Sequence, residues 1–399
     1  MTNDEGSPKA QMTEQRSKHE RRNSDFVIPS TFDLRYSTFR SDLIATNAEL
    51  AQLIGKINAV DRVAVDTEAD SLHSYREKLC LLQISLATAG SADGNDFMVD
   101  PLANLDLAPL RLALEGSEIV LHGADYDLRM LRRGVNFVAN TIFDTVIAAQ
   151  LLGIREFSLA ALVKRYFAIE LPKGSQKANW AQRPLPRRMA EYAINDVHYL
   201  LPLAEELEAE LDRQCRLDWL RQSCQRAIQQ AEYQRVRDQD EVWRIRGSGS
   251  LRGREAAVLR ALWQWREKEA ELADRPPFHI LQNHELLNAA VAFASGNAPD
   301  YRHFSSRRRQ TFHQAAKSAM ELPEFEWPVS RRRVGRRPGS ETMRLTEELR
   351  RRRDQAAREL NLEPAFIAPR STLEAVATNQ TRAIPLLVPW QRELLGLEG

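Results

Sequence analysis

The sequence contains little cysteine and no long apolar run. Only three of its 399 residues are cysteines: Cys80 falls in an apolar run that predicts a strand, while Cys215 and Cys224 fall on a predicted helix. So few cysteines exclude a disulfide framework, nothing in their spacing indicates a zinc site, and a reducing cytoplasm is the expected location. No apolar stretch reaches the roughly 20 residues of a membrane span, and the polar first 25 residues carry no visible secretory signal. We therefore expect no membrane association.

An excess of charge of one sign is also absent from the chain as a whole. Lys and Arg number 56 against 55 Asp and Glu, which gives a net charge of +1. The distribution is nevertheless uneven, because the segment from Tyr301 to Arg353 carries 15 basic residues and only 6 acidic ones. Arginine clusters of this kind neutralise phosphates and indicate nucleic-acid contact. The alternative is that they form solvated helix faces or a basic linker.

Length and patterning predict several domains. Residues 1–30 are polar and charged, which is typical of a disordered tail. From 31 to 230, short apolar strands alternate with helical segments, a pattern that predicts a mixed sheet flanked by helices. A long helical stretch from Pro186 past Ala227 is expected to close this α/β domain. The expected strands lie near 62–66, 79–87, 96–99 and 118–122.

Beyond about residue 243 the sequence predicts only helices, and these show a faint internal repeat. Pro277, which breaks one helix, and Leu286, in the next helix, have counterparts 87 residues later at Pro364 and Leu373. Equal spacing of a helix, a proline and a second helix indicates duplicated all-α bundles. Coincidence in a region rich in Arg and Ala is the alternative. The two bundles are expected at 243–325 and 341–399.

Three short segments together contain five oxygen-bearing side chains that are candidates for one functional site: Asp66, Glu68, Asp127, Tyr192 and Asp196. Asp66 and Glu68 are two residues apart on a predicted buried strand, so both carboxylates face the same side. Tyr192 and Asp196 are four residues apart on a predicted helix and share one of its faces. Asp127 follows an apolar run and should lie at the start of a helix. A strand, a helix start and a helix face can converge on one pocket.

Each segment alone also has an ordinary interpretation, as solvated acids or as a packed tyrosine beside a surface acid. Together, acids at the edges of buried segments need a partner, because burying unpaired charge is costly. Hard divalent cations such as Mg²⁺ or Mn²⁺ prefer oxygen ligands, and two of them roughly 3.5–4 Å apart form a clamp for phosphodiester cleavage. The set therefore predicts a metal-dependent nuclease. His122 is expected to be a structural histidine at a strand end, with a general base or metal ligand as the alternative.

In this order, the three segments resemble those of the DEDD superfamily of 3′–5′ exonucleases, in the subgroup with tyrosine in its third motif. The resemblance covers about residues 31–230 and is closest to the ribonuclease D branch. Flanking segments that share it are Leu81–Ile84, Phe143–Thr145, Ser158-Leu159 and Arg183–Pro186. It implies a ribonuclease H-like mixed sheet and an exoribonuclease that releases nucleoside 5′-monophosphates. Ala69 and Asn179 depart from the usual family residues, which puts substrate positioning in doubt but not metal binding.

The resemblance also implies a role for each site residue. Asp66 would contact both of two divalent cations, Glu68 and Asp196 would complete the inner site, and Asp127 would hold the second cation through water. Tyr192 would orient the attacking water by hydrogen bonding. Asp66, Glu68, Asp127 and Asp196 are thus the implied metal ligands.

The helical region resembles the HRDC domain, which occurs at the C-termini of helicases and ribonuclease D. Trp243, Leu262, Trp265 and Pro276-Pro277 carry this likeness in the first bundle, and the second bundle shows it more weakly. The layout implies a monomer that grips structured RNA, with tRNA precursors carrying 3′ extensions as expected substrates. Two alternatives stay open: a DNA 3′–5′ exonuclease, and a non-catalytic RNA-binding protein on a nuclease scaffold. Retention of all four acids and the tyrosine argues against the second.

Overall fold

A computed structural model of the chain describes residues 43–87, 95–172, 174–232, 238, 241–329 and 339–397. The predicted disordered tail at 1–30 lies outside the described residues. So do the arginines at 331–333 and 336–337 of the basic segment. Among the described residues, no helix combines the length and apolar composition that crossing a membrane requires.

The N-terminal part of the described chain is built on one six-stranded mixed sheet with the strand order β1-β4-β3-β2-β5-β6. The strands are β1 (Leu43–Ile44), β2 (Arg62–Ala69), β3 (Leu79–Leu86), β4 (Asp96–Val99), β5 (Glu118–Leu121) and β6 (Thr141–Asp144). β3 pairs antiparallel with β2 and β4, whereas the β2–β5, β5–β6 and β1–β4 pairs are parallel. The predicted mixed sheet is confirmed, but β1 and β6 were not predicted, because β1 has only two residues and β6 leads directly into α4.

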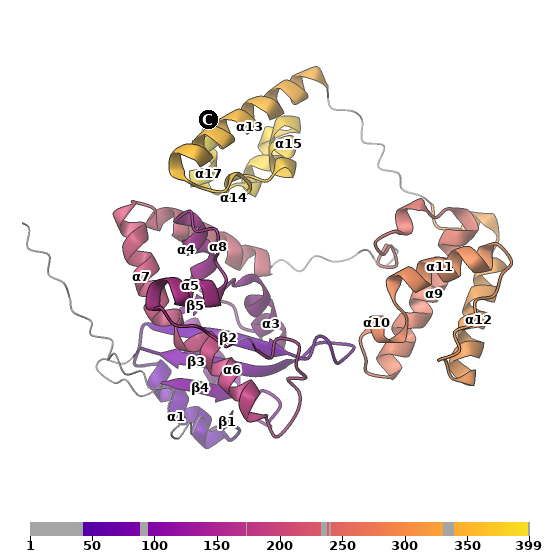
Figure 1. Ribbon diagram of the computed structural model, residues 1–399, viewed down its shortest axis with the longest axis horizontal. Helices are drawn as coiled ribbons and strands as arrows, with labels where there is room; N and C mark the ends of the chain where they lie inside the picture. Colours follow the sequence, from indigo (N-terminus) through magenta and orange to yellow (C-terminus); the bar gives the residue numbers. More distant parts are fainter. Residues whose placement is uncertain are drawn as a thin grey trace, which may run out of the picture. The chain divides into compact units, whose positions relative to one another are not determined.

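Helices flank this sheet, and α6 lies across β2, β3 and β4 (Figure 1). The helices are α1 (Asn47–Ile57), α2 (Ala108–Glu115), α3 (Asp125–Val135), α4 (Thr145–Leu151), α5 (Leu159–Phe167), α6 (Arg187–His198), α7 (Leu200–Arg213) and α8 (Leu217–Glu232). The helical stretch predicted after Pro186 is therefore divided into three helices. Cys215 lies in the turn between α7 and α8 with φ of 55°, so its predicted place on a helix is wrong. A left-handed residue just after a helix ends it, which a helical pattern alone does not reveal.

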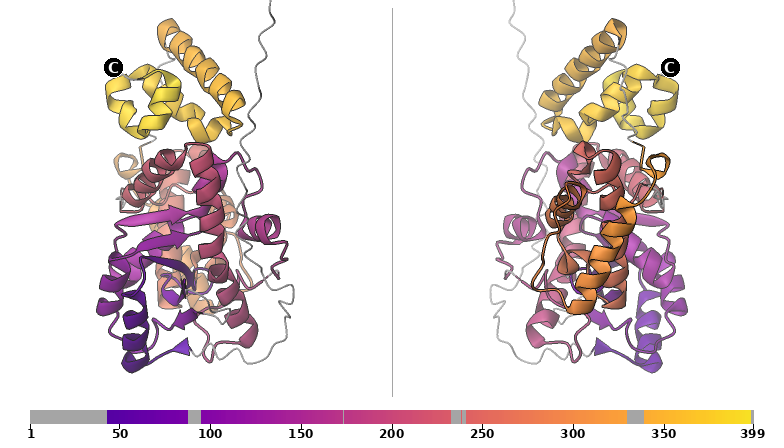
Figure 2. Two further views of the ribbon diagram at one scale, coloured as in Figure 1. Left: turned by 90° about the vertical axis from the view of Figure 1, so that its left-hand side faces the viewer. Right: turned by 90° about the vertical axis from the view of Figure 1, so that its right-hand side faces the viewer.

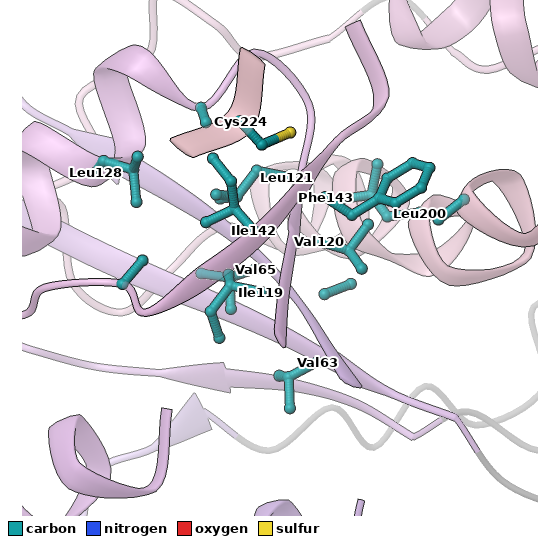
Figure 3. Close-up of a cluster of buried hydrophobic side chains, with 14 of the residues drawn as sticks. Val63, Val65, Ile119, Val120, Leu121, Leu128, Ile142, Phe143, Leu200 and Cys224 are labelled. Atoms are coloured by element: carbon teal, nitrogen blue, oxygen red, sulfur yellow. The ribbon is translucent and has the colours of Figure 1, made fainter. Parts of the chain in front are cut away.

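The alternation of side chains along β2 separates the core from the acids. Val63 and Val65 point to one face, where they pack among residues of β5, β6, α7 and α8 (Figure 3). Asp66 and Glu68 point to the opposite face, since successive side chains of a strand alternate. That opposite face is the one over which α6 packs, because Leu81 of β3, opposite Glu68, shares a hydrophobic cluster with Met189 and Ala193 of α6.

The described residues from 241 onward form helices and no strand (Figures 1 and 2). The first group is α9 (Gly253–Leu272), α10 (Pro277–Ile280), α11 (Asn283–Ala294) and α12 (Ser306–Met320). The second is α13 (Ser340–Leu360), α14 (Pro364–Ile367), α15 (Arg370–Thr378), α16 (Gln380–Ala383) and α17 (Pro389–Leu395). Short 3₁₀ turns lie at Ser248–Ser250, Glu324–Glu326 and Ile384–Leu386. The all-α expectation for this part is confirmed.

One hydrogen bond recurs in both groups at the predicted interval. Arg266 of α9 donates to the carbonyl of Leu281 at 3.1 Å, and Arg353 of α13 donates to the carbonyl of Ala368 at 3.0 Å. Both pairs are related by the same 87-residue shift that relates Pro277, at the start of α10, to Pro364, at the start of α14. In both groups, an arginine of the long helix thus hydrogen-bonds the segment after the short proline helix, as duplicated bundles would lead one to expect.

Candidate active site

Three of the five predicted side chains form one compact cluster. Asp66 and Glu68 come from β2, and Asp196 comes from α6, which crosses that strand (Figure 1). Each residue offers a carboxylate oxygen, and these oxygens all lie within 4.8 Å of one another. The β2 strand continues to Ala69, as the predicted common orientation of its two acids requires.

Tyr192 and Asp196 share one face of α6, one turn apart. The Tyr192 hydroxyl hydrogen-bonds the Asp196 carboxylate and also the side chain of Gln176. The tyrosine ring packs beside the fully buried Trp180, with ring centroids 6.1 Å apart. Gly174 comes so close to the ring that a Cβ at this position would overlap it. The loop before α6 therefore fixes the position of the tyrosine.

Asp127 lies in the first turn of α3, as predicted, and is buried. It is not one of the three acids whose oxygens lie within 4.8 Å of one another, but its charge acts on both Asp66 and Asp196. The Thr67 hydroxyl donates a 2.5 Å hydrogen bond to its carboxylate. Because β5 pairs with β2 only from Arg62 to Ala64, the later part of β2 is open to α3. Asp127 thus stands beside the cluster, held by β2 itself.

The ionisation of these acids is strongly perturbed. Burial, then the charges of Asp127, Asp196 and Glu68, raise the pKa of Asp66 well above its ordinary value. Burial also raises the pKa of Glu68 to about 9, with repulsion from Asp196 and Asp127 adding to the effect. The pKa of Asp196 rises to about 7 through burial, although the Tyr192 hydrogen bond lowers it, and that of Asp127 rises to about 6. Oxygen ligands that repel one another in a partly buried site fit a hard divalent cation, which would relieve the repulsion.

Asp144 is a buried acid of a different kind, because backbone donors surround its carboxylate. It caps α4 by accepting from Val146 at 2.8 Å and Ile147 at 3.4 Å. It also accepts from the backbone of Gly123 at 3.0 Å and Ala124 at 2.8 Å, in the turn that leads into α3. Asp144 therefore fixes the start of the helix that presents Asp127.

No histidine among the described residues belongs to the acid cluster. Nδ1 of His122 lies 2.8 Å from the Thr145 hydroxyl, and burial lowers the pKa of His122. The interpretation of His122 as a structural histidine agrees with this contact. Nε2 of His73 lies 3.1 Å from the carbonyl of Lys177, and Nδ1 of His198 lies 2.6 Å from Asp96.

Sequence reasoning missed Thr67, Gln176 and Asp144 as supports of the site. Thr67 stands between the two acids of β2 and faces the opposite side of the sheet, so strand alternation gives no reason to count it with them. The other two contacts join segments that are distant in sequence, and no local pattern signals them.

Comparison with known proteins adds independent information. Residues 42–212 match the family described as 3′–5′ exonuclease, and residues 255–293 match the HRDC domain. Ribonuclease D of Zymomonas mobilis is 35% identical over 62% of this chain and 63% of that protein. Ribonuclease D of Sphingobium indicum is 28% identical over 90% of this chain and 93% of that protein. Among solved structures, the RNase D of Escherichia coli shares the fold with a TM-score of 0.66 at 22% identity, covering 89% of this chain and 96% of that chain.

Proposed function

Because this chain is an exoribonuclease of the ribonuclease D family, we propose that it removes nucleoside 5′-monophosphates one at a time from RNA 3′ ends with two divalent cations, Mg²⁺ or Mn²⁺. The observation that carries the proposal is the partly buried cluster of Asp66, Glu68 and Asp196, whose carboxylates repel one another in the absence of a positive partner. Asp127 beside the cluster supplies a fourth carboxylate.

The proposed roles follow from where each side chain lies. Asp66, Glu68 and Asp196 would hold one cation, and Asp66 with Asp127 would hold the second. Divalent cations at such a site stabilise charge on phosphoryl oxygens and lower the pKa of coordinated water. Burial and the nearby carboxylates raise the pKa of Tyr192, so its hydroxyl keeps its proton and can donate a hydrogen bond. We assign Tyr192 the task of orienting the attacking water toward the phosphorus.

Two variants test this assignment. Asp66→Ala and Asp196→Ala should each abolish RNA digestion while leaving RNA binding largely unchanged, because neither removes a basic contact. Asp125→Ala is the matched control: this acid lies in the same turn of α3 as Asp127 but is exposed and pairs with Arg129. Digestion by both purified cluster variants at the wild-type rate would contradict the metal assignment.

The proposed substrates are structured RNAs with 3′ extensions, tRNA precursors among them. The Escherichia coli relative is described as an exoribonuclease involved in structured RNA processing. Support within this chain comes from α12, whose residues from Ser306 to Met320 include basic side chains and no acid. Arg307 and Lys317 on this helix are exposed, and Arg309, His313 and Lys317 line a groove beside α11. Such a helix can follow a phosphate backbone.

The basic residues of both helices are partly neutralised. On α12, Arg308 pairs with Glu269 at 3.0 Å, Arg309 with Asp300 at 3.2 Å and Lys317 with Glu321 at 3.9 Å, so its acidic partners lie outside the helix. On α13, the acidic partners lie on the helix itself. Arg350 pairs with Glu347 at 2.8 Å, and Arg352 pairs with Glu348. These residues fit the alternative of solvated helix faces better than phosphate contact. A double variant, Arg307→Ala with Lys317→Ala, should therefore weaken RNA binding and reduce the salt slope of log K by about 1 per lost phosphate contact. The matched double variant, Arg350→Ala with Arg352→Ala, should change neither the RNA affinity nor the salt slope. Equal effects of the two double variants would reject the role of α12.

The remaining proposals concern organisation. We place the exonuclease domain at 31–230 and the two helical domains at 243–325 and 341–399, supported by the hydrophobic clusters of the two helical groups. We also propose that the protein acts as a monomer in the cytoplasm, where the unpaired Cys80, Cys215 and Cys224 would remain reduced.

A further inference from the structure

A glutamine in the sheet of the exonuclease domain has no hydrogen-bond partner. The side chain of Gln83 on β3 is fully buried, at 0% exposure. Neither its amide nitrogen nor its amide oxygen contacts a donor or acceptor among the described residues. Native proteins seldom leave a buried amide unpaired, because its lost hydration is not replaced. The position therefore requires a partner that the protein chain alone does not supply.

The strand register places this amide next to the acid cluster. Gln83 is the direct antiparallel partner of Asp66 across the β2–β3 ladder. Directly opposed residues share a face of the sheet, with Cβ atoms about 4.5–5.5 Å apart. On the other side, Gln83 is opposite Met98 of β4, which is buried and apolar. Of its two cross-strand neighbours, only Asp66 offers a polar group.

Among the described residues, few groups donate hydrogen bonds to the ionised carboxylate of Asp66. The backbone of Thr67 donates a hydrogen bond to it, and its neighbours in the cluster are carboxylates. A carboxylate that binds cations must stay ionised and correctly oriented, and outer partners commonly supply the hydrogen bonds that achieve this. The amide nitrogen of glutamine is a donor that carries no charge and does not compete for the cation.

We propose that Gln83 is a positioning residue for the metal site: its amide nitrogen donates to the Asp66 carboxylate, directly or through one buried water, when the acids hold divalent cations. This inference rests on the proposed metal-dependent function. An unpaired buried amide costs stability, and a hydrogen bond to the ionised Asp66 carboxylate would remove that cost when cations hold the acids. The residue thereby favours cation binding without touching the cation.

The test replaces Gln83 by methionine in the full chain, since methionine has similar length and no hydrogen-bonding group. Gln83→Met should melt at the same temperature as wild type or higher in chelator, because two unpaired polar atoms are removed from the core. Its Mn²⁺ affinity, measured by titration calorimetry, should fall about tenfold. Gln83→Leu is a second apolar replacement, for which we expect the same result for the melting temperature in chelator and the same loss of Mn²⁺ affinity.

Ser85→Ala is the matched control. Ser85 is also buried, two residues along the same face of β3, but it is opposite Ala64 instead of an acid of the cluster. Its Mn²⁺ affinity should equal that of wild type. Lower melting temperatures of both Gln83 variants in chelator, or Mn²⁺ affinities within twofold of wild type, would overturn the proposal.

Failure of the proposed metal-dependent function would give different results from failure of the Gln83 proposal alone. Asp66→Ala should lose both Mn²⁺ binding and RNA digestion whatever Gln83 does. If Asp66→Ala loses both while Gln83→Met binds Mn²⁺ normally, only the role of Gln83 is rejected. If Asp66→Ala binds Mn²⁺ and digests RNA like wild type, the metal site is misplaced and the role of Gln83 is rejected with it.

Discussion

The hydroxyl of Thr67 donates a 2.5 Å hydrogen bond to the carboxylate of Asp127. Thr67 belongs to β2, between Asp66 and Glu68, while Asp127 belongs to α3, 60 residues later in the chain. The strand therefore contributes twice to the site, with two acids on one face and with a hydroxyl on the other that positions a third acid.

This relationship predicts the effect of replacing Thr67 by valine, which has the same shape and suits a strand. Without the hydroxyl, Asp127 is free to turn, and we expect the rate of RNA shortening to fall about tenfold with little change in melting temperature. Steady-state digestion of a 5′-labelled RNA measures the rate. The exposed strand threonine Thr141 provides the control, since Thr141→Val should leave the rate unchanged. A wild-type rate for Thr67→Val would show that Asp127 needs no such support.

The backbone bonds of Asp144 predict a large effect on stability. Asp144→Ala removes the acceptor for the amides of Gly123, Ala124, Val146 and Ile147, which lie in the partly buried junction of α3 and α4. Because buried donors without partners are costly, urea unfolding should show a loss of about 3 kcal/mol or more. The exposed Asp125→Ala should stay within about 0.5 kcal/mol of wild type. Similar stabilities for the two variants would contradict the structural role of Asp144.

The close approach of Gly174 predicts a loss of turnover without a loss of metal binding. Alanine at this position would displace the ring of Tyr192 and with it the hydroxyl that bonds Asp196. We expect at least about a tenfold lower kcat, because small misplacements of a catalytic group are costly, and an unchanged Mn²⁺ affinity. Gly55→Ala is the control, since a Cβ there meets no atom within 4 Å. Normal turnover in Gly174→Ala would show that the loop does not position the tyrosine.

The raised pKa of Glu68 predicts how the stability of metal-free protein depends on pH. In the folded chain this carboxyl keeps its proton up to about pH 9, whereas its ordinary pKa is 4.5. The unfolded state therefore releases a proton that the folded state retains, and folding stability falls as pH rises from about 4.5 toward 9.

Glu68→Gln has no carboxyl group at this position, so the variant should not lose folding stability in this way as pH rises. In chelator at pH 8 the variant should melt at least about 2 °C above wild type, and the difference should shrink toward pH 5. Adding Mn²⁺ at pH 8 should reverse the order, because cation binding stabilises the wild type more than the variant. Thermal melts at the two pH values, with and without metal, provide the measurement. A variant less stable than wild type in chelator at pH 8 would show that Glu68 is not held in a repulsive cluster.

The residues that could be predicted from the sequence are those with a local pattern. Asp66 and Glu68 follow from strand alternation, and Tyr192 and Asp196 follow from helical spacing, because both periodicities are properties of the backbone. That Gln83 lies opposite Asp66 depends on strand register, which is set by packing across the sheet. The Thr67–Asp127 bond and the Asp144 contacts join segments whose proximity only the folded chain creates. β6 was missed because it leads directly into α4 and shows only two apolar residues, Ile142 and Phe143, before the helix begins.

The most direct measurement follows the purified chain acting on a 5′-labelled, 3′-extended tRNA, with a matched single-stranded RNA and a matched DNA alongside. The account predicts stepwise shortening of RNA from its 3′ end with Mg²⁺ or Mn²⁺, release of nucleoside 5′-monophosphates, and no reaction in chelator. Internal cuts, shortening in chelator, or digestion of the DNA in preference to both RNAs would contradict it.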